Sequence, residues 1–163
     1  MNCFLRNEEE PKPAGEVCAA WRLEAQGWSK VDCVLDSGAA DSVCPRGMAP
    51  HFAIEDTAAS RAGVFYTSAD GARINNIGQQ TIPVALENGA RTSAIFQVAE
   101  VSRPLMSVGK VCEMGNRVLF GAGGGYILNI ASGEATPFYK KDGVYIFTIW
   151  IPPIAEAGPG FAR

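Results

Sequence analysis

Residues 33–42 read CVLDSGAADS, and this stretch decides how the rest of the sequence is interpreted. The small and apolar residues 33–35 predict a buried strand, and Asp36 stands at its end. A carboxylate at the end of an apolar strand is costly to bury unless a partner or a reaction uses it. The Ser-Gly that follows favours a tight turn. Asp36 is therefore either a turn residue or the working group of an enzyme.

Composition narrows the class of protein. The chain has 163 residues, 47% of them hydrophobic, and a net charge of −3, which indicates one globular domain. No dense run of Lys or Arg is present, so neither nucleic-acid binding nor attachment to a membrane is expected. Residues 1–13 are acidic where a signal peptide would be apolar, and the longest apolar run, residues 144–151, is too short to span a bilayer.

The cysteines indicate the compartment. There are five and none forms a CxxC pair, so neither a disulfide framework nor a zinc site is indicated. We expect no metal and no cofactor. A reducing intracellular environment, with the cytoplasm as the expected location, fits this pattern best.

Turn signals divide the chain into short segments with strand-like composition. Residues 16–25 and 28–35 are predicted to pair as a hairpin around Gln26-Gly27. Asp70-Gly71 and Asn88-Gly89 are predicted to be the tips of two more hairpins. Residues 44–56, rich in Pro and Gly, are predicted to be irregular.

The second half of the chain gives the same picture. One short helix is predicted over residues 108–114, because Gly115 follows where a C-terminal cap belongs. The Gly-rich residues 121–126 are interpreted as a flexible turn. Further strands are predicted at residues 116–120, 125–130 and 143–151. Without long amphipathic helices, the chain is predicted to be all-β, as a small barrel or sandwich.

An Asp-Ser-Gly triplet alone is a weak signal, but its context is more specific. Three stretches follow in order, VLDSGAADSVCP (34–45), YTSADGARINNIGQQTIPV (66–84) and PLMSVGKVCEMGNRVLF (104–120), with GGGYILNI (123–130) after them. In this order they resemble retropepsin-like aspartic proteases, and within that group the protease region of Copia-type retrotransposon polyproteins. The resemblance covers about residues 17–130. It implies a single-lobed, all-β acid protease barrel with one short helix, acting as a homodimer.

The resemblance also implies roles for individual residues. Asp36 corresponds to the catalytic acid, Ser37 to the hydroxyl that bonds across the dimer, and Gly38 to the tight turn beside the carboxylates. Substrate binding falls to three groups: the loop residues Ala39, Ala40 and Asp41, the tip of a flap at Ser68, Ala69, Asp70 and Gly71, and the underlying segment Leu105, Met106 and Ser107.

The chemistry implied is hydrolysis of a peptide bond in a polyprotein. A two-fold axis would bring Asp36 of each subunit together, so one aspartate per chain is enough. Two adjacent carboxylates cannot both ionise, so the ionised one activates a water and the protonated one polarises the scissile carbonyl. The flap would close over an extended peptide and exclude water.

Two positions depart from the retroviral pattern. Ser107 stands where glycine is expected, although Copia-type sequences also carry Ser there. Ala40 replaces an acid that grips the substrate backbone, and Asp41 is expected to take part of that role. Other residues are given structural interpretations: surface acids at Asp41, Glu55 and Asp56, a loop histidine at His51, buried thiols at Cys33 and Cys44, and core or dimer contacts at Trp150.

The chain then divides into a charged flexible tail (1–15), a protease domain (16–120), additional C-terminal strands packed on it (121–151) and a second flexible tail (152–163). Three functions remain open. The first is an active homodimeric aspartic endopeptidase. The second is a retropepsin-like dimerisation or peptide-binding module without catalysis. The third is an unrelated small β-barrel that binds a partner and contains the triplet by chance.

Overall fold

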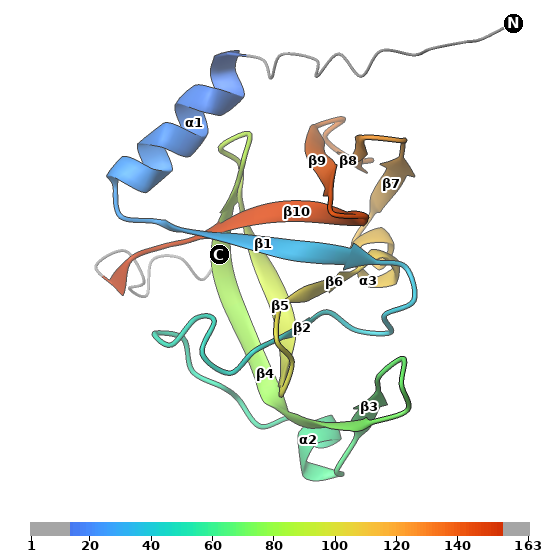
Figure 1. Cartoon of the computed structure of the whole chain (residues 1–163). Coiled ribbons are helices and arrows are strands. Elements are labelled where there is room, and N and C mark those ends of the chain that lie inside the picture. Colours follow the sequence, from blue (N-terminus) through green and yellow to red (C-terminus); the bar gives the residue numbers. More distant parts are fainter. Residues whose placement is uncertain (1–13, 155–163) are drawn as a thin grey trace, which may run out of the picture.

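A computed structural model describes residues 14–154, with side chains from residue 19 onward. These residues are mostly β, with ten strands and three short helices (Figure 1). The all-β class is therefore confirmed at this level. Flexible tails are predicted at residues 1–15 and 152–163; of these, residues 1–13 and 155–163 lie outside the described residues, whereas Ala14 and Gly15 belong to a helix, so the first tail is predicted too long. The strands are β1 (Ser29–Asp36), β2 (Val43–Cys44), β3 (Phe65–Thr67), β4 (Arg73–Leu86), β5 (Arg91–Ala99), β6 (Leu105–Ser107), β7 (Asn116–Phe120), β8 (Gly124–Asn129), β9 (Ala135–Lys141) and β10 (Val144–Ile151), and the helices are α1 (Ala14–Ala25), α2 (Ala58–Arg61) and α3 (Val108–Glu113).

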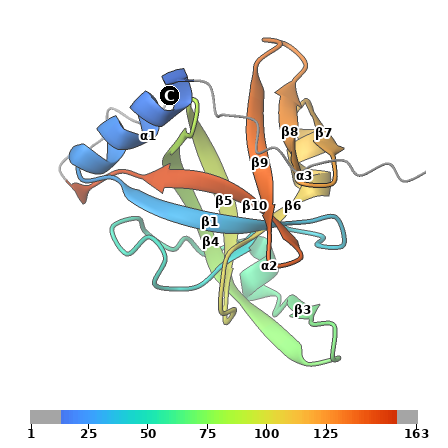
Figure 2. The same ribbon diagram turned by 45° about the horizontal axis from the view of Figure 1, so that its top comes forward.

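The strands hydrogen-bond in the order β3-β4-β5-β2-β6-β1-β10-β9-β8-β7. An additional pairing of β10 with β4, at Ile149 and Leu86, joins the six strands from β4 to β10 into a closed cycle. Most pairs are antiparallel, but β1 runs parallel to β6 and β2 runs parallel to β5. Figures 1 and 2 show β7, β8 and β9 rising together beside this cycle, while the β3–β4 hairpin extends from the opposite end.

One apolar core joins the early and late strands. Cys33 and Leu35 from β1 pack in the same buried cluster as Ile127 from β8 and Phe147 from β10. Burying each large apolar side chain contributes about 1.5–3 kcal/mol relative to leaving it exposed. The C-terminal strands are thus part of the packing that holds the Asp36 strand in place.

Residues 14–25 form a helix, so the strand predicted at 16–25 and its hairpin are wrong. Its sequence, AGEVCAAWRLEA, is rich in Ala, Leu, Glu and Arg, which favour helices. Gly27, with φ +83°, ends the helix rather than turning a hairpin. The amides of Gly27 and Trp28 bond back to Glu24 and Leu23, which is the Schellman pattern. Leu23 and Trp28 then pack together in a second, smaller cluster.

The other local predictions divide more evenly. The helix at 108–114 is confirmed as α3, with Gly115 at φ +83° after it, and both predicted hairpin tips join paired strands. The expectation of only one short helix is wrong, because α1 and α2 are also present in residues 14–154. Residues 44–56 are largely irregular, as predicted. None of the described helices is long and apolar enough to cross a membrane.

The Gly-rich stretch at 121–126 is only partly a turn. Gly124 and Gly125 belong to β8, where the backbones of Leu119 and Phe138 approach them closely from β7 and β9. Strand β9 itself is not predicted from the sequence, since Pro137 argues against a strand. The Trp150 side chain is buried in the smaller cluster, and His51 is exposed in a loop; both agree with their structural interpretations.

Candidate active site

Asp36 lies at the end of β1, where the strand leaves the core. Val34 and Leu35 before it are buried, whereas Asp36 is half-buried and Ser37 is exposed. Its Oδ1 accepts a hydrogen bond of 2.7 Å from the Gly38 amide. In residues 14–154 this is the one hydrogen bond that the carboxylate makes. The acid is thus held by its own turn, with its remaining lone pairs available to another group.

Gly38 has a geometric reason to be glycine. A Cβ at this position would lie 3.3 Å from Asp36 Oδ1, closer than side-chain carbons ordinarily approach. The absent side chain therefore allows the carboxylate to fold back on the amide. The resemblance implies a tight-turn role for Gly38, and this steric requirement is compatible with it.

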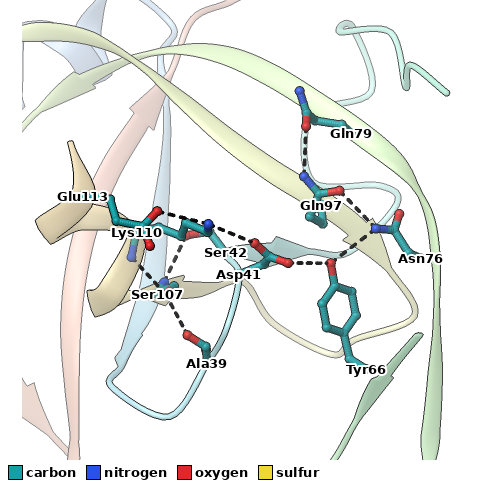
Figure 3. A network of polar contacts seen from close by, with 10 residues as sticks. All are labelled: Ala39, Asp41, Ser42, Tyr66, Asn76, Gln79, Gln97, Ser107, Lys110 and Glu113. Atoms are coloured by element: carbon teal, nitrogen blue, oxygen red, sulfur yellow. Dashed lines mark hydrogen bonds and ion pairs between the residues drawn. The ribbon is translucent and has the colours of Figure 1, made fainter. Parts of the chain in front are cut away.

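Ser107 lies under the loop that follows Asp36. Asp36 and Ser107 are partners in the parallel pairing of β1 and β6, and the Ser107 side chain is fully buried. Its Oγ donates to the Ala39 carbonyl at 2.7 Å and accepts from the Lys110 amide at 3.2 Å, while its own amide donates to Ser42 Oγ at 3.0 Å. The hydroxyl thus ties the loop to the start of α3 (Figure 3). A glycine here could make only the amide contact.

Leu105 and Met106 also lie beneath this loop. Both pair with β1 through the parallel register, and Met106 is buried in the main core. Above them, Ala39 is half-buried and Ala40 is exposed. The structure therefore brings together Asp36, the residues that follow it and the segment 105–107, from parts of the chain about seventy residues apart.

Asp41 lies at the surface, as its interpretation expects, with its side chain 36% exposed, but its carboxylate also has partners. Tyr66 Oη donates to Asp41 Oδ2 at 3.2 Å, and Lys110 Nζ lies 3.8 Å from Oδ1. Lys110 also binds Glu113 at 3.1 Å. Figure 3 shows Asp41 between the tyrosine and the lysine. The carboxylate therefore has partners on β3 and α3, of which Lys110 is itself exposed. Glu55 and Asp56, by contrast, are exposed as expected.

Tyr66 is a site residue that the sequence does not single out. Burial, and then the nearby charge of Asp41, raises the pKa of the Tyr66 phenol to about 12, so it stays protonated and donates near neutral pH. The same oxygen accepts from Asn76 Nδ2 at 3.3 Å. The sequence predicts only that Tyr66 lies in a strand. Its contact to Asp41 has no local signal, because the two residues are 25 positions apart.

The tip of the β3–β4 hairpin is organised by local contacts. Gly71, with φ +86°, donates its amide to the Ser68 carbonyl, and Ser68 hydrogen-bonds to Asp70. That contact and the Ala72 amide lower the pKa of Asp70. Asp70, Gly71 and Ala69 are exposed. Among the described residues, the side-chain hydrogen bonds of this tip join Ser68, Asp70 and Ala72 and stay within the turn. Tyr66 makes the hydrogen bond to the loop after Asp36.

A large cavity lies beside this loop, and Asp36 is not part of its wall. It has a volume of about 910 Å³ and an apolar floor that includes Met106 and Phe147. Asp41, Lys110 and Gln97 contribute polar groups to its wall. The cavity is large enough for peptide side chains. It adjoins the loop on the side that Asp41 faces.

Cys33 and Cys44, which flank the triplet, are fully buried, as expected. Burial raises the pKa of both thiols, that of Cys44 to about 12. Neither is therefore suited to act as a nucleophile. Among the described residues, no group of three or more His, Cys, Asp or Glu side chains is placed to hold a metal ion.

Comparison with known proteins gives no assignment. No family model matches the chain, and no curated protein is significantly similar to it.

Proposed function

We propose that the protein is an aspartic endopeptidase of the retropepsin type, active as a homodimer and cleaving extended peptides in a retroelement polyprotein. One observation carries the proposal. Asp36 ends a strand in parallel register with Ser107, half-exposed, with its carboxylate bonded by the Gly38 amide and its loop anchored from below. This arrangement presents an acid on a rigid turn at the edge of the core, which suits catalysis better than an ordinary surface turn.

The chemistry requires a second carboxylate. One chain supplies one Asp-Ser-Gly triplet, so a two-fold dimer is the arrangement that completes a pair. At close range the two acids would share one proton, because both cannot be charged. The ionised Asp36 would take a proton from water, and the protonated one would donate to the scissile carbonyl oxygen. Their roles exchange when the leaving nitrogen is protonated.

The β3–β4 hairpin is the part of the structure best suited to cover a substrate. At its tip Ala69, Asp70 and Gly71 are solvent-exposed, and Tyr66 at its base contacts the loop after Asp36. An extended peptide could pair with the hairpin through backbone hydrogen bonds, and closure would exclude water from the carboxylates.

A catalytically inactive, retropepsin-like dimerisation or peptide-binding module is the second candidate. It is favoured by Asp41, which the substrate-gripping role requires to be available but which is bonded to Tyr66 and close to Lys110. Ala40, exposed and without a polar side chain, cannot replace it. The third candidate, an unrelated β-barrel that binds a partner, predicts a monomer.

Proteolysis of a mixed peptide library tests these alternatives. The purified protein is assayed between about pH 4 and pH 7, where a carboxyl pair shares one proton, with and without pepstatin. Asp36→Asn keeps the shape and the acceptor for Gly38, so it should abolish cleavage while leaving fold and dimer intact. Asp56→Asn, at an exposed acid, is the matched control and should cleave normally.

The outcomes separate the candidates. Cleavage that pepstatin blocks and Asp36→Asn lacks supports the protease. An inactive protein that sediments as a dimer favours the binding module, and an inactive monomer favours the unrelated β-barrel. Loss of folding in Asp36→Asn assigns Asp36 a structural role instead.

A further inference from the structure

A chain of polar contacts connects the β3–β4 hairpin to the loop that carries Asp36. It runs from Glu113 and Lys110 on α3, through Asp41 in the loop, to Tyr66 on β3. From there it continues through Asn76 on β4 to Gln97 on β5 (Figure 3). We infer that Tyr66 is a positioning residue, which latches the hairpin to the catalytic loop through its hydrogen bond to Asp41. The inference rests on the proposed function and deepens it.

The direction of the tyrosine proton is determined by its neighbours. A phenol has one hydrogen to donate. Asn76 Nδ2 donates to Tyr66 Oη at 3.3 Å, so the tyrosine proton is left for Asp41 Oδ2 at 3.2 Å. A hydrogen bond to a charged acceptor is stronger than one between neutral groups. Within this network of polar contacts, the Tyr66–Asp41 hydrogen bond is therefore the strongest contact between the hairpin and the loop.

Asn76 is itself held rigidly. Its side chain is buried, and its Oδ1 accepts from the Gly78 amide at 2.9 Å, across an irregularity in the β4–β5 register. Its Nδ2 also donates to Gln97 Oε1 at 3.0 Å, and Gln97 Nε2 donates to Gln79 at 2.9 Å. Tyr66 and Asn76 belong to the two paired strands of one hairpin, so this contact holds the tyrosine oxygen to the hairpin when the hairpin moves.

The loop side of the latch is equally anchored. Next to Asp41, the Ser42 hydroxyl oxygen accepts from the Ser107 amide. The Ser42 carbonyl accepts from the Gln97 amide at 2.8 Å. Asp41 therefore cannot follow the hairpin far. Lifting β3 away from the loop must break the Tyr66–Asp41 hydrogen bond, and closing it must restore that bond. Substrate binding under the hairpin is coupled in this way to the position of the Asp36 loop.

The chain offers a matched pair of variants. Tyr66→Phe removes only the hydroxyl. Tyr139→Phe removes a second tyrosine–aspartate bond, from Tyr139 Oη to Asp32 Oδ2, also 3.2 Å long but joining β9 to β1. Asp41→Asn keeps an acceptor for the tyrosine and removes the charge. Its effects should lie between those of wild type and Tyr66→Phe.

Amide hydrogen exchange tests whether Tyr66 joins the hairpin to the loop, and it does not require the protein to cleave peptides. In Tyr66→Phe we expect exchange about tenfold faster in residues 65–76 and 37–44 together, because the lost bond joins the two segments. Tyr139→Phe should leave both segments unchanged. Unaltered exchange in Tyr66→Phe, or faster exchange in the hairpin alone, overturns the inference.

Peptidase kinetics then test the positioning role. If the protein cleaves peptides, kcat/KM should fall about tenfold in Tyr66→Phe, with the larger part in KM, and stay unchanged in Tyr139→Phe. Faster exchange with unaltered kinetics shows a structural tie and overturns the positioning role. A wild type as inactive as Asp36→Asn refutes the proposed function, while the exchange result still decides whether Tyr66 couples the two segments.

Discussion

Ser107 Oγ donates to the carbonyl oxygen of Ala39 at 2.7 Å, although 68 residues separate them in the chain. The same oxygen accepts the Lys110 amide and so caps α3. One buried hydroxyl therefore satisfies a loop carbonyl and a helix amide at once. Ser107, where the resemblance leads us to expect glycine, is in this chain the anchor of the Asp36 loop.

Replacing Ser107 by alanine should lower the free energy of unfolding by about 1–3 kcal/mol, because the half-buried Ala39 carbonyl and the Lys110 amide lose their partner. Ser107→Gly should cost slightly more through backbone entropy. Denaturant unfolding measures both, with Ser102→Ala at an exposed loop position as the control. Equal midpoints for Ser107→Ala and wild type would show that the hydroxyl contacts contribute nothing.

Gly71→Val should impair peptide cleavage. Gly71 has φ +86°, where a side chain costs about 1–2 kcal/mol, so valine should distort the tip of the hairpin. Gly133→Val is the matched control, because Gly133 has φ +74° and open space around it in the β8–β9 turn. We expect kcat/KM to fall in the first variant and not in the second. Equal rates would mean that this hairpin is not the flap.

Alkaline pH should weaken the protein through Tyr66. Its pKa in the folded state is about 12, above the ordinary value of 10.0, so folding favours the protonated phenol. This stabilisation is complete below about pH 10 and is lost as the pH rises from about 10 to about 12. Wild type should therefore lose more stability than Tyr66→Phe across that interval, measured as unfolding midpoints at several pH values. Parallel losses in both proteins would contradict the assignment.

Gly125→Ala should destabilise the C-terminal strands. A methyl group there would overlap the Leu119 carbonyl and lie 2.6 Å from the Phe138 ring, so β7 and β8 would have to separate. We expect a loss of about 2 kcal/mol or more in the free energy of unfolding. Gly123→Ala has nothing within 4 Å and should stay within about 0.5 kcal/mol of wild type. Similar losses in both variants would contradict the explanation by close packing.

Features with a local chemical signal are predictable from the sequence. The turns at Gly71 and Gly89 and the cap at Gly115 each need a positive φ, which glycine adopts without strain. The same preference of glycine for a positive φ explains why a hairpin is predicted around Gly27, where the structure has the end of α1. Gly27 also has a positive φ, but a helix C-terminus and a hairpin both use such a glycine, and the segment before it decides between them.

The contacts that organise the candidate site are not local. Asp36 pairs with Ser107, and Asp41 bonds Tyr66, across distances in sequence that no short pattern encodes. Asp41 is a surface acid, as its own segment predicts, but its contacts to Tyr66 on β3 and Lys110 on α3 are not encoded in that segment. Composition and turn chemistry therefore predict the class of fold and the position of Asp36, whereas the network around the loop needs the tertiary structure.

The position of β10 has a consequence for biosynthesis. Val144–Ile151 pairs with β1 from Ser29 to Val34 and also with β4, so the strand that ends in Asp36 gains its antiparallel neighbour only when residues 144–151 have been synthesised. Pairing between such distant segments is slow, because the loop between them must close first. A ribosome-bound chain that stops before β10 has the Asp-Ser-Gly triplet but an open edge beside it. The order of the strands thus delays completion of the Asp36 strand until β10 has been synthesised.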